Sequence, residues 1–315
     1  MKIAFYFRDE EAPLWMQALR QALPQAKIED WSVMDAVPDA VRQAGDADYA
    51  LAWAPPQAFI DSQKRIKALF NIGAGVDALL KLRLPGHVPV IRLDDAGMGE
   101  QMADYVCHYL LRHVREFDQY EAAQGASQWK QREARNRADF PVGIMGLGVL
   151  GSRVAQAVRP FGFPLLGWSR SPSKVEGVRC FHGADQFKDF LGATKVLVCL
   201  LPLTAQTRDI LNFENLSSLR PGAYLINVAR GALLVEEDLI RAIDQGHLAG
   251  ATLDVFRAEP LPAAHPFWTH PAIHVTPHIS AQTLPKDSIA QIANKIMALE
   301  RGETVAGVVD LQRGY

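Results

Sequence analysis

The sequence predicts an α/β protein built from two doubly wound parallel-sheet domains. Short apolar runs of strand length alternate with stretches of helical periodicity along most of the chain, which is typical of parallel sheets covered by helices on both faces. One long amphipathic stretch near residue 110 interrupts the alternation, which then resumes. The length of 315 residues is enough for about two domains, so each half of the alternation predicts one domain.

The first series of strands and helices lies before residue 99. Its expected strands are the apolar runs 2–7, 49–53, 66–73 and 88–93, and its expected helices are 12–23 and 76–82. The chain closes with another predicted helix at 286–301. If that helix returns to the first domain, this domain is discontinuous and consists of residues 1–98 and 285–315, and the second domain spans 99–284.

A single long helix is predicted between the two series, from residue 99 to residue 124. Its apolar side chains recur at spacings of three and four and form one stripe: Ala103, Val106, Leu110, Val114 and Phe117. The stretch that follows, 125–139, is polar and charged apart from Trp129. We expect the helix to bridge the two domains and the polar stretch to form an arm.

The second series opens with a glycine-rich turn. Its expected strands are 142–147, 164–168, 195–201, 223–228, 250–254 and 273–277. The first of them runs into Gly146-x-Gly148-x-x-Gly151, and an apolar helical face follows. In this context the glycines allow a tight turn, close approach of a pyrophosphate and close helix packing, while the helix N-terminus attracts phosphate. The pattern predicts a Rossmann dinucleotide-binding domain; the alternative is a strand–helix turn without a ligand. The expected contacts are Gly146, Leu147, Gly148, Val149, Leu150 and Gly151.

The next strand end indicates which dinucleotide is bound. An Asp or Glu often stands there and binds the ribose 2′-hydroxyl of NAD, but this chain has Ser169 and Arg170, with Lys174 close behind. A carboxylate would repel a 2′-phosphate, whereas a hydroxyl can donate to it and a guanidinium can pair with it. The site is therefore predicted to prefer NADPH, with NADH bound more weakly. The alternative is that both cations are solvated loop charges.

Composition excludes several classes of protein. A formal net charge of −2 gives no general attraction to nucleic acid or to a membrane surface. The longest apolar run, 196–203, is far shorter than the roughly 18 residues that cross a bilayer, and Arg8 interrupts any signal-peptide core. Cys107, Cys180 and Cys199 are too few and too scattered for a disulfide framework. We expect a cytoplasmic protein that binds neither nucleic acid nor membrane.

Four polar residues follow the last three predicted strands. Arg230 follows one, Asp254 and Glu259 follow the next, and His278 follows the last. The carboxyl ends of strands in a doubly wound sheet face one crevice, so these side chains can converge there. The spacing of His278 from His270 and His274 imitates a metal site on a helix, but two prolines exclude a helix there. We therefore expect no metal.

With these residues in place, the chain resembles the D-2-hydroxyacid dehydrogenase family over essentially its whole length. That family combines the glycine turn with an Arg, a Glu and a His in the order of Arg230, Glu259 and His278. NIGAGVDAL at 71–79 is similar to its substrate loop, and DLIRAIDQGHLAGATLDVF to the stretch before its Glu. The segments RLDDAGMGEQMADYV, LLPLTAQT, GAYLINVARGALLVEEDL and RGY resemble a bacterial branch that reduces glyoxylate and hydroxypyruvate.

The resemblance implies an architecture and an activity. The larger domain would be the Rossmann cofactor domain and the smaller, discontinuous one a flavodoxin-like substrate domain. The helix and arm at 99–139 would form the interface of a homodimer. The implied activity is NADPH-dependent reduction of a small 2-keto acid, such as glyoxylate to glycolate or hydroxypyruvate to D-glycerate.

The reaction needs a proton donor and a binding site for negative charge. Hydride transfer to a carbonyl carbon leaves charge on the oxygen, and His278 is the natural acid because histidine titrates near neutral pH. Glu259 would favour the imidazolium and orient it. Arg230 would hold the substrate carboxylate and the keto oxygen, because its donors form a planar fork.

Further contacts belong to the same hypothesis. Backbone N–H groups of Ala74 and Gly75 would bind the substrate carboxylate. By resemblance, Asp254 would bind the nicotinamide carboxamide. Trp53 would wall the substrate pocket, or would be an ordinary crevice aromatic. The remaining expected cofactor contacts are Leu201, Pro202, Val228, Ala229 and His278.

Several alternatives stay open at this point. The substrate could be a bulkier 2-keto acid, or the chain could be a dinucleotide-sensing binding module, although a sensor would not need the complete Arg230, Glu259 and His278 set. Arg230 could form a salt bridge at a helix start and Glu259 could be a turn residue. Asp254 could cap the end of its strand.

Overall fold

The computed structural model describes residues 1–34 and 37–315 and divides the chain into two compact units. Unit 1 consists of Met1–Gly97 and Thr283–Tyr315, and unit 2 of Met98–Gln282. The sequence-based boundaries, after residues 98 and 284, lie one and two residues further along the chain. No helix in the described part of the chain is long and apolar enough to cross a membrane.

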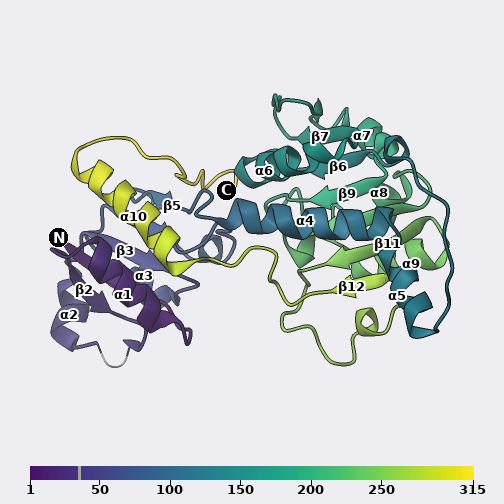
Figure 1. Ribbon diagram of the computed structural model, residues 1–315. Coiled ribbons are helices and arrows are strands. Elements are labelled where there is room, and N and C mark those ends of the chain that lie inside the picture. The colour runs from purple at the N-terminus through teal and green to yellow at the C-terminus, as the bar shows by residue number, and fades with distance from the viewer. Residues whose placement is uncertain (35–36) are drawn as a thin grey trace. The chain divides into compact units, whose positions relative to one another are not determined.

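Unit 1 contains a parallel sheet in the order β2-β1-β3-β4-β5, which is five-stranded in the described residues. Its strands belong to the purple and blue part of the chain (Figure 1). This is the flavodoxin-like strand order. The strands are β1 (Lys2–Tyr6), β2 (Lys27–Asp30), β3 (Tyr49–Ala52), β4 (Ala68–Asn71) and β5 (Val90–Ile91). Strand β2 is not predicted by the sequence because this edge strand, KIED, has no buried side chain and hence no apolar pattern.

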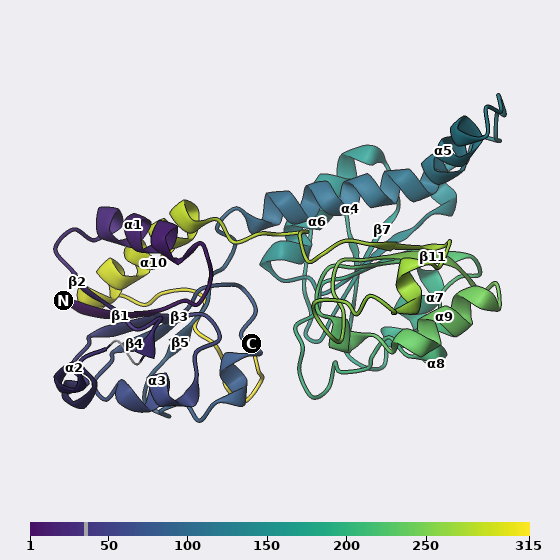
Figure 2. The same ribbon diagram turned by 90° about the horizontal axis from the view of Figure 1, so that it is seen from below.

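Helices cover both faces of this sheet. Helices α1 and α10 lie side by side on one face, and α2 and α3 lie on the other (Figure 2). Their bounds are α1 (Ala12–Ala22), α2 (Asp39–Ala44), α3 (Gln57–Ser62) and α10 (Pro285–Glu300). The expected helix at 76–82 is wrong: only the 3₁₀ turn Leu79–Lys81 forms. The apolar side chains that suggested a helix, such as Val76 and Leu79, are buried in the unit 1 core from a turn and loop instead.

Unit 2 contains a parallel sheet in the order β12-β11-β10-β9-β6-β7-β8, seven-stranded in the residues that the structure describes. It is a Rossmann order extended by one strand. The strands are β6 (Val142–Met145), β7 (Leu165–Ser169), β8 (Arg179–His182), β9 (Val196–Cys199), β10 (Ala223–Asn227), β11 (Leu248–Leu253) and β12 (Ile273–Val275). Strand β8 was not expected from the sequence because it is a polar edge strand, RCFH, with one buried side chain.

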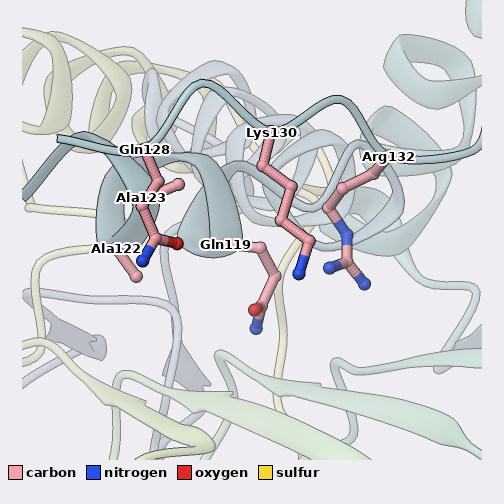
Figure 3. A pocket seen from close by; sticks show the side chains of 6 residues that line it. All are labelled: Gln119, Ala122, Ala123, Gln128, Lys130 and Arg132. Carbon is pink, nitrogen blue, oxygen red and sulfur yellow. The ribbon is translucent and has the colours of Figure 1, made fainter. Parts of the chain in front are cut away.

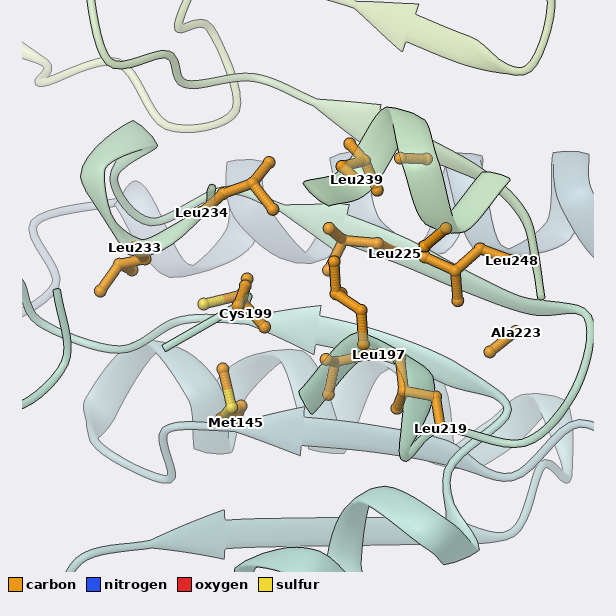
Figure 4. Packing of buried hydrophobic residues seen from close by; sticks show 14 of the residues in the cluster. Met145, Leu197, Cys199, Leu219, Ala223, Leu225, Leu233, Leu234, Leu239 and Leu248 are labelled. Atoms are coloured by element: carbon orange, nitrogen blue, oxygen red, sulfur yellow. The ribbon is translucent and has the colours of Figure 1, made fainter. Parts of the chain in front are cut away.

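Two apolar layers form around this sheet. Helices α4 and α6 cover one face, with Val106, Leu110 and Val154 among the buried side chains. Helices α7, α8 and α9 cover the other, where Leu197, Leu225 and their neighbours pack (Figure 4). The bounds are α4 (Met98–Val114), α5 (Phe117–Gly125), α6 (Val149–Val158), α7 (Phe187–Ala193), α8 (Phe213–Ser217) and α9 (Glu236–Asp244). Short 3₁₀ turns occupy Arg137–Asp139, Arg159–Phe161, Gly231–Leu233 and Pro266–Trp268.

The single helix expected at 99–124 is wrong. The structure ends α4 at Val114 and starts α5 at Phe117, with Glu116 between them in the left-handed region at φ 55°. The Glu116 carboxylate accepts hydrogen bonds from Arg132 at 2.7 Å and Arg135 at 2.6 Å. These two arginines belong to the arm, so contacts distant in the sequence stabilise the break, and helical periodicity does not reveal them.

Candidate active site

The glycine turn lies between β6 and α6. Gly146 has φ 111°, and a Cβ there would lie 2.8 Å from the Leu200 carbonyl oxygen. A Cβ on Gly151 would lie only 1.8 Å from the Gly146 oxygen, so both glycines are required by the protein itself. A Cβ on Gly148 would meet nothing within 4 Å. Open space at that position leaves room for a phosphate group to approach the backbone at the start of α6, so the turn fits a dinucleotide.

The loop after β7 is organised by serine hydroxyls. Ser169 is the last residue of the strand, and its Oγ donates to the Ser171 carbonyl at 2.8 Å and lies 3.0 Å from the Ser173 Oγ. The structure therefore brings Ser173, which was not predicted from the sequence, beside Ser169 of the predicted 2′-phosphate residues. Arg170 and Lys174 are both exposed in the same loop, so the loop combines hydroxyl and cationic groups that can face a phosphate.

The His278 imidazole and the Glu259 carboxylate form a hydrogen-bonded pair. Nδ1 of His278 lies 2.8 Å from Oε2 of Glu259, and the other carboxylate oxygen accepts the Phe256 N–H at 2.9 Å. Burial opposes ionisation of Glu259, but these two hydrogen bonds, with the charges of His278 and Arg230, lower its pKa below the usual value. An ionised carboxylate only accepts, so Nδ1 carries a proton and Nε2 is the ring atom left to exchange one.

The backbone around His278 is held by Asp254. His278 has φ 55°, and its N–H donates to the Asp254 carbonyl at 2.9 Å. The completely buried Asp254 carboxylate accepts from the N–H groups of Ile279 and Ser280, both at 2.8 Å. Thr276 Oγ1 donates to the same carboxylate at 2.6 Å and lies 2.5 Å from the hydroxyl of Tyr105 on α4. These contacts fix a left-handed conformation that is otherwise unfavourable for a non-glycine residue.

The expected role of Asp254 toward the nicotinamide carboxamide stays a prediction. Both of its carboxylate oxygens already serve the turn that carries His278. The structure thus gives this residue a positioning task that the spacing along the chain does not reveal.

Arg230 follows β10 in an extended conformation. Its Nη1 donates to the Ala229 carbonyl at 2.7 Å. The Asn227 side-chain amide donates to the Arg230 carbonyl at 3.3 Å and accepts from the Ala229 N–H at 3.2 Å. A Cβ on Gly231 would lie 1.9 Å from the Phe256 carbonyl carbon. The loop of Arg230 therefore packs directly on the backbone of the loop that carries Glu259. The neighbouring cofactor candidates Val228, Ala229 and Leu201 are buried, and Pro202 follows Leu201 after β9.

In unit 1, the expected substrate loop follows β4. Ala74 and Gly75 are part-exposed, and the indole of Trp53 is 38% exposed. A Cβ on Gly73 would lie 2.4 Å from Cζ3 of Trp53, so the indole lies directly against the loop. The buried Asn71 amide donates to two carbonyls of the same loop, a role that no pattern in the sequence predicts.

The histidines with metal-like spacing have separate partners. His270 lies 3.3 Å from Asp244 and His274 lies 3.2 Å from Asp118, while His278 contacts Glu259. Within residues 1–34 and 37–315, no group of three potential His, Cys, Asp or Glu ligands is close enough to hold a metal ion.

Comparison with known proteins decides the family. The sequence model of the D-isomer specific 2-hydroxyacid dehydrogenase NAD binding domain matches residues 107–280, more than half of the chain. The chain belongs to this dehydrogenase family. The resemblance and the fold class inferred from the sequence are thereby confirmed, and the glycine turn lies within the matched NAD-binding domain.

Individual relatives of this dehydrogenase match along its whole length. Glyoxylate/hydroxypyruvate reductase A of Serratia proteamaculans is 48% identical, and that of Photorhabdus laumondii is 47% identical, each with 100% of both chains covered. A D-isomer specific 2-hydroxyacid dehydrogenase from Xanthobacter autotrophicus, solved with NADPH and MES, has a TM-score of 0.94 at 40% identity, covering 100% and 99% of the two chains. An NADPH-dependent glyoxylate/hydroxypyruvate reductase from Sinorhizobium meliloti, solved with NADP and sulfate, has a TM-score of 0.91 at 33% identity, with the same coverage.

Proposed function

We propose that this dehydrogenase is a cytoplasmic, NADPH-dependent reductase of small 2-keto acids, which converts glyoxylate to glycolate and hydroxypyruvate to D-glycerate. The hydrogen-bonded pair of His278 and Glu259, 2.8 Å apart beside the loop of Arg230, is the observation that carries the proposal. The names of the full-length relatives and the NADP-bound structural neighbours support the choice of substrate and cofactor.

In this proposal the side chains handle the proton and the charge of the reaction. NADPH supplies the hydride when it is bound. The Nε2 proton of His278 goes to the keto oxygen, and Glu259 stabilises the imidazolium through Nδ1 until the proton leaves. The guanidinium of Arg230 offsets the negative charge that develops on the oxygen and holds the substrate carboxylate. Glu259 is fit for its role because its lowered pKa keeps it ionised at neutral pH.

The cofactor would bind along the carboxyl edge of the unit 2 sheet. Its pyrophosphate would lie on the turn Gly146–Gly151, where Gly148 leaves open space and the start of α6 offers N–H donors. Its 2′-phosphate would meet Ser169, Arg170 and Lys174, with Ser173 close to Ser169. Asp254 and His278 would lie near the nicotinamide, together with the buried segment Leu201, Pro202, Val228 and Ala229.

The substrate carboxylate would also contact the loop of Ala74 and Gly75, with Trp53 as a wall. The indole that lies against Gly73 limits the room beside this loop, which suits a small 2-keto acid better than a bulky one.

A homodimer built through α4, α5 and the arm belongs to the same proposal. The arm is fastened to the start of α5 by the contacts of Arg132 and Arg135 with Glu116, yet the side chain of Trp129 is fully exposed. Figure 3 shows the hollow between α5 and the arm, lined by Gln119, Ala122, Ala123, Gln128, Lys130 and Arg132. A fixed arm that presents a large apolar side chain to solvent favours contact with a second copy of the chain.

Initial rates of NADPH and NADH oxidation test the proposal. Each cofactor is combined with glyoxylate, hydroxypyruvate, pyruvate and a branched, bulkier 2-keto acid. We expect fast turnover with NADPH and the first two acids, and much slower turnover with NADH. Faster turnover of the bulky acid would replace the substrate assignment. Binding of NADPH without turnover of any acid would favour the sensing module.

A further inference from the structure

Asn71 is a buried polar residue at the end of an apolar strand. It closes β4, whose four residues are all buried, and only 1% of it is exposed. Its Nδ2 donates to the carbonyl oxygens of Gly73 and Gly75, at 2.9 Å each. Burying an amide is unfavourable unless its hydrogen bonds are made. Here both amide hydrogens are used within a single short loop.

These two hydrogen bonds set the direction of the loop's peptide groups. The C=O and the N–H of a trans peptide point in opposite directions. The Gly73 and Gly75 oxygens point toward the Asn71 amide, so the N–H groups of Ala74 and Val76 point away from it. The peptide group that joins Ala74 to Gly75 lies between these two fixed peptide groups and is held at both ends. Among residues 1–34 and 37–315, the N–H groups of Ala74 and Gly75 have no acceptor within the protein.

A second contact restricts the loop on another side. Gly73 has φ 152°, and the ring of Trp53 occupies the space that a Cβ would need, at 2.4 Å. The Gly73 oxygen accepts a further hydrogen bond from the Leu93 N–H at 3.2 Å. The loop is therefore held by the Asn71 amide, the Leu93 N–H and the Trp53 indole before any ligand binds. Successive fixed N–H groups of this kind form anion-binding sites.

We propose that Asn71 is a positioning residue that holds the N–H groups of Ala74 and Gly75 ready to receive the carboxylate of the 2-keto acid. The inference rests on the proposed function, which places the substrate carboxylate at this loop. Asn71 itself does not touch the substrate. Its effect is on carboxylate binding and hence on KM.

Two variants and one matched control test the inference. Asn71→Ala removes both donors, and Asn71→Ser keeps a hydroxyl that can donate once. Tyr49→Phe is the control: it removes a hydrogen bond of 2.7 Å to Glu300 in the same unit, at the opposite end of the neighbouring strand β3. The measurements are kcat and KM for glyoxylate, the same constants for methylglyoxal, which lacks a carboxylate, and the affinities for NADPH and for oxamate, an inert carboxylate analogue.

Asn71→Ala should raise KM for glyoxylate and Kd for oxamate about tenfold or more, as expected for the loss of an oriented charged hydrogen bond. Its kcat, its NADPH affinity and its kcat/KM for methylglyoxal should stay within about threefold of the wild type. The KM for glyoxylate and the Kd for oxamate of Asn71→Ser should lie between those of Asn71→Ala and the wild type. Tyr49→Phe should behave like the wild type. If Asn71→Ala does not fold, the Kd of Asn71→Ser for oxamate tests the inference: a raised Kd supports it, and an unchanged Kd contradicts it.

Other outcomes would overturn the inference. A merely structural role would lower the thermal midpoint and kcat while leaving KM and oxamate affinity unchanged. Equal losses for glyoxylate and methylglyoxal would show that the carboxylate is not what the loop recognises. If the wild-type chain turns over no 2-keto acid, the proposed function fails. Oxamate binding that weakens in Asn71→Ala would then still support the role of Asn71, and no oxamate binding by the wild type would refute it.

Discussion

The His278 imidazole Nδ1 lies 2.8 Å from the Glu259 carboxylate, although nineteen residues separate the two in the sequence. Each belongs to a loop that follows one of two adjacent parallel strands, β11 and β12. The pair thus depends on the register of the sheet. The turn that carries His278 depends in addition on the buried carboxylate of Asp254.

Glu259→Gln should lower kcat and move the alkaline limb of the pH–rate profile to lower pH. The amide still accepts a hydrogen bond from Nδ1, but it no longer carries the charge that favours the imidazolium. The pKa of Glu259 is lowered, so in the wild type this charge is present throughout the neutral range. We expect a loss of about ten- to a hundredfold, within the range of acid–base contributions, measured as kcat against pH. An unchanged alkaline limb would remove Glu259 from this role.

Thr276→Val should lower kcat about tenfold while NADPH affinity and KM change little. Valine cannot donate to Asp254, so the left-handed turn at His278 loses one of its supports and the imidazole is less well positioned. Thr276→Ser keeps the hydroxyl and should behave like the wild type. Tyr105→Phe removes only the outer hydroxyl and should have a smaller effect. Equal losses in the serine and valine variants would contradict the prediction.

Arg170→Ala should weaken NADPH binding about ten- to a hundredfold, which is the range for a hydrogen bond to a charged group. NADH has no 2′-phosphate, so its affinity should hardly change. Fluorescence titration of both cofactors checks this. An equal loss of affinity for NADPH and NADH would mean that the loop after β7 does not bind the 2′-phosphate.

His113→Phe should reduce the acid sensitivity of folding. Burial, followed by the charges of Arg135 and Lys195, lowers the pKa of His113 from 6.5 to about 4. The unfolded chain therefore binds more protons than the folded chain between these values, and stability falls as pH drops from about 6.5 to about 4. The linked loss is about 3 kcal/mol. Phenylalanine keeps the stacking on Tyr224, whose ring centroid lies 4.1 Å away. Urea unfolding at pH 7 and pH 4.5 measures the difference, and an equal decline in both proteins would refute the assignment.

Trp129→Ala should weaken the proposed homodimer. Light scattering after gel filtration should give twice the chain mass for the wild type, and the variant should shift toward the single-chain mass on dilution. Trp268→Ala is a matched control, because Trp268 is also exposed, at 51%, and belongs to the same unit. A wild type with the single-chain mass at every concentration would refute the dimer.

Local patterns in the sequence were sufficient for much of the fold. Buried strands such as 196–199 are continuous apolar runs, and the glycine turn has an internal steric reason at Gly146 and Gly151. The pattern failed where exposure removes the apolar signal, as in the edge strands β2 and β8. It also failed at Glu116, where helical periodicity continues but the backbone turns.

By itself, the sequence determined the two-domain α/β class, the dinucleotide turn and the order of Arg230, Glu259 and His278, because these follow from side-chain periodicity and from short motifs. Only the tertiary structure decided the helix break at Glu116, the hydrogen bonds of Asp254 to the turn that carries His278, and the hydrogen bonds of Asn71 to the loop after β4. The physical reason is that these features depend on which buried donors and acceptors meet after folding. A hydrogen bond from Thr276 to Asp254, or from Arg132 to Glu116, joins residues whose spacing along the chain carries no periodic signal.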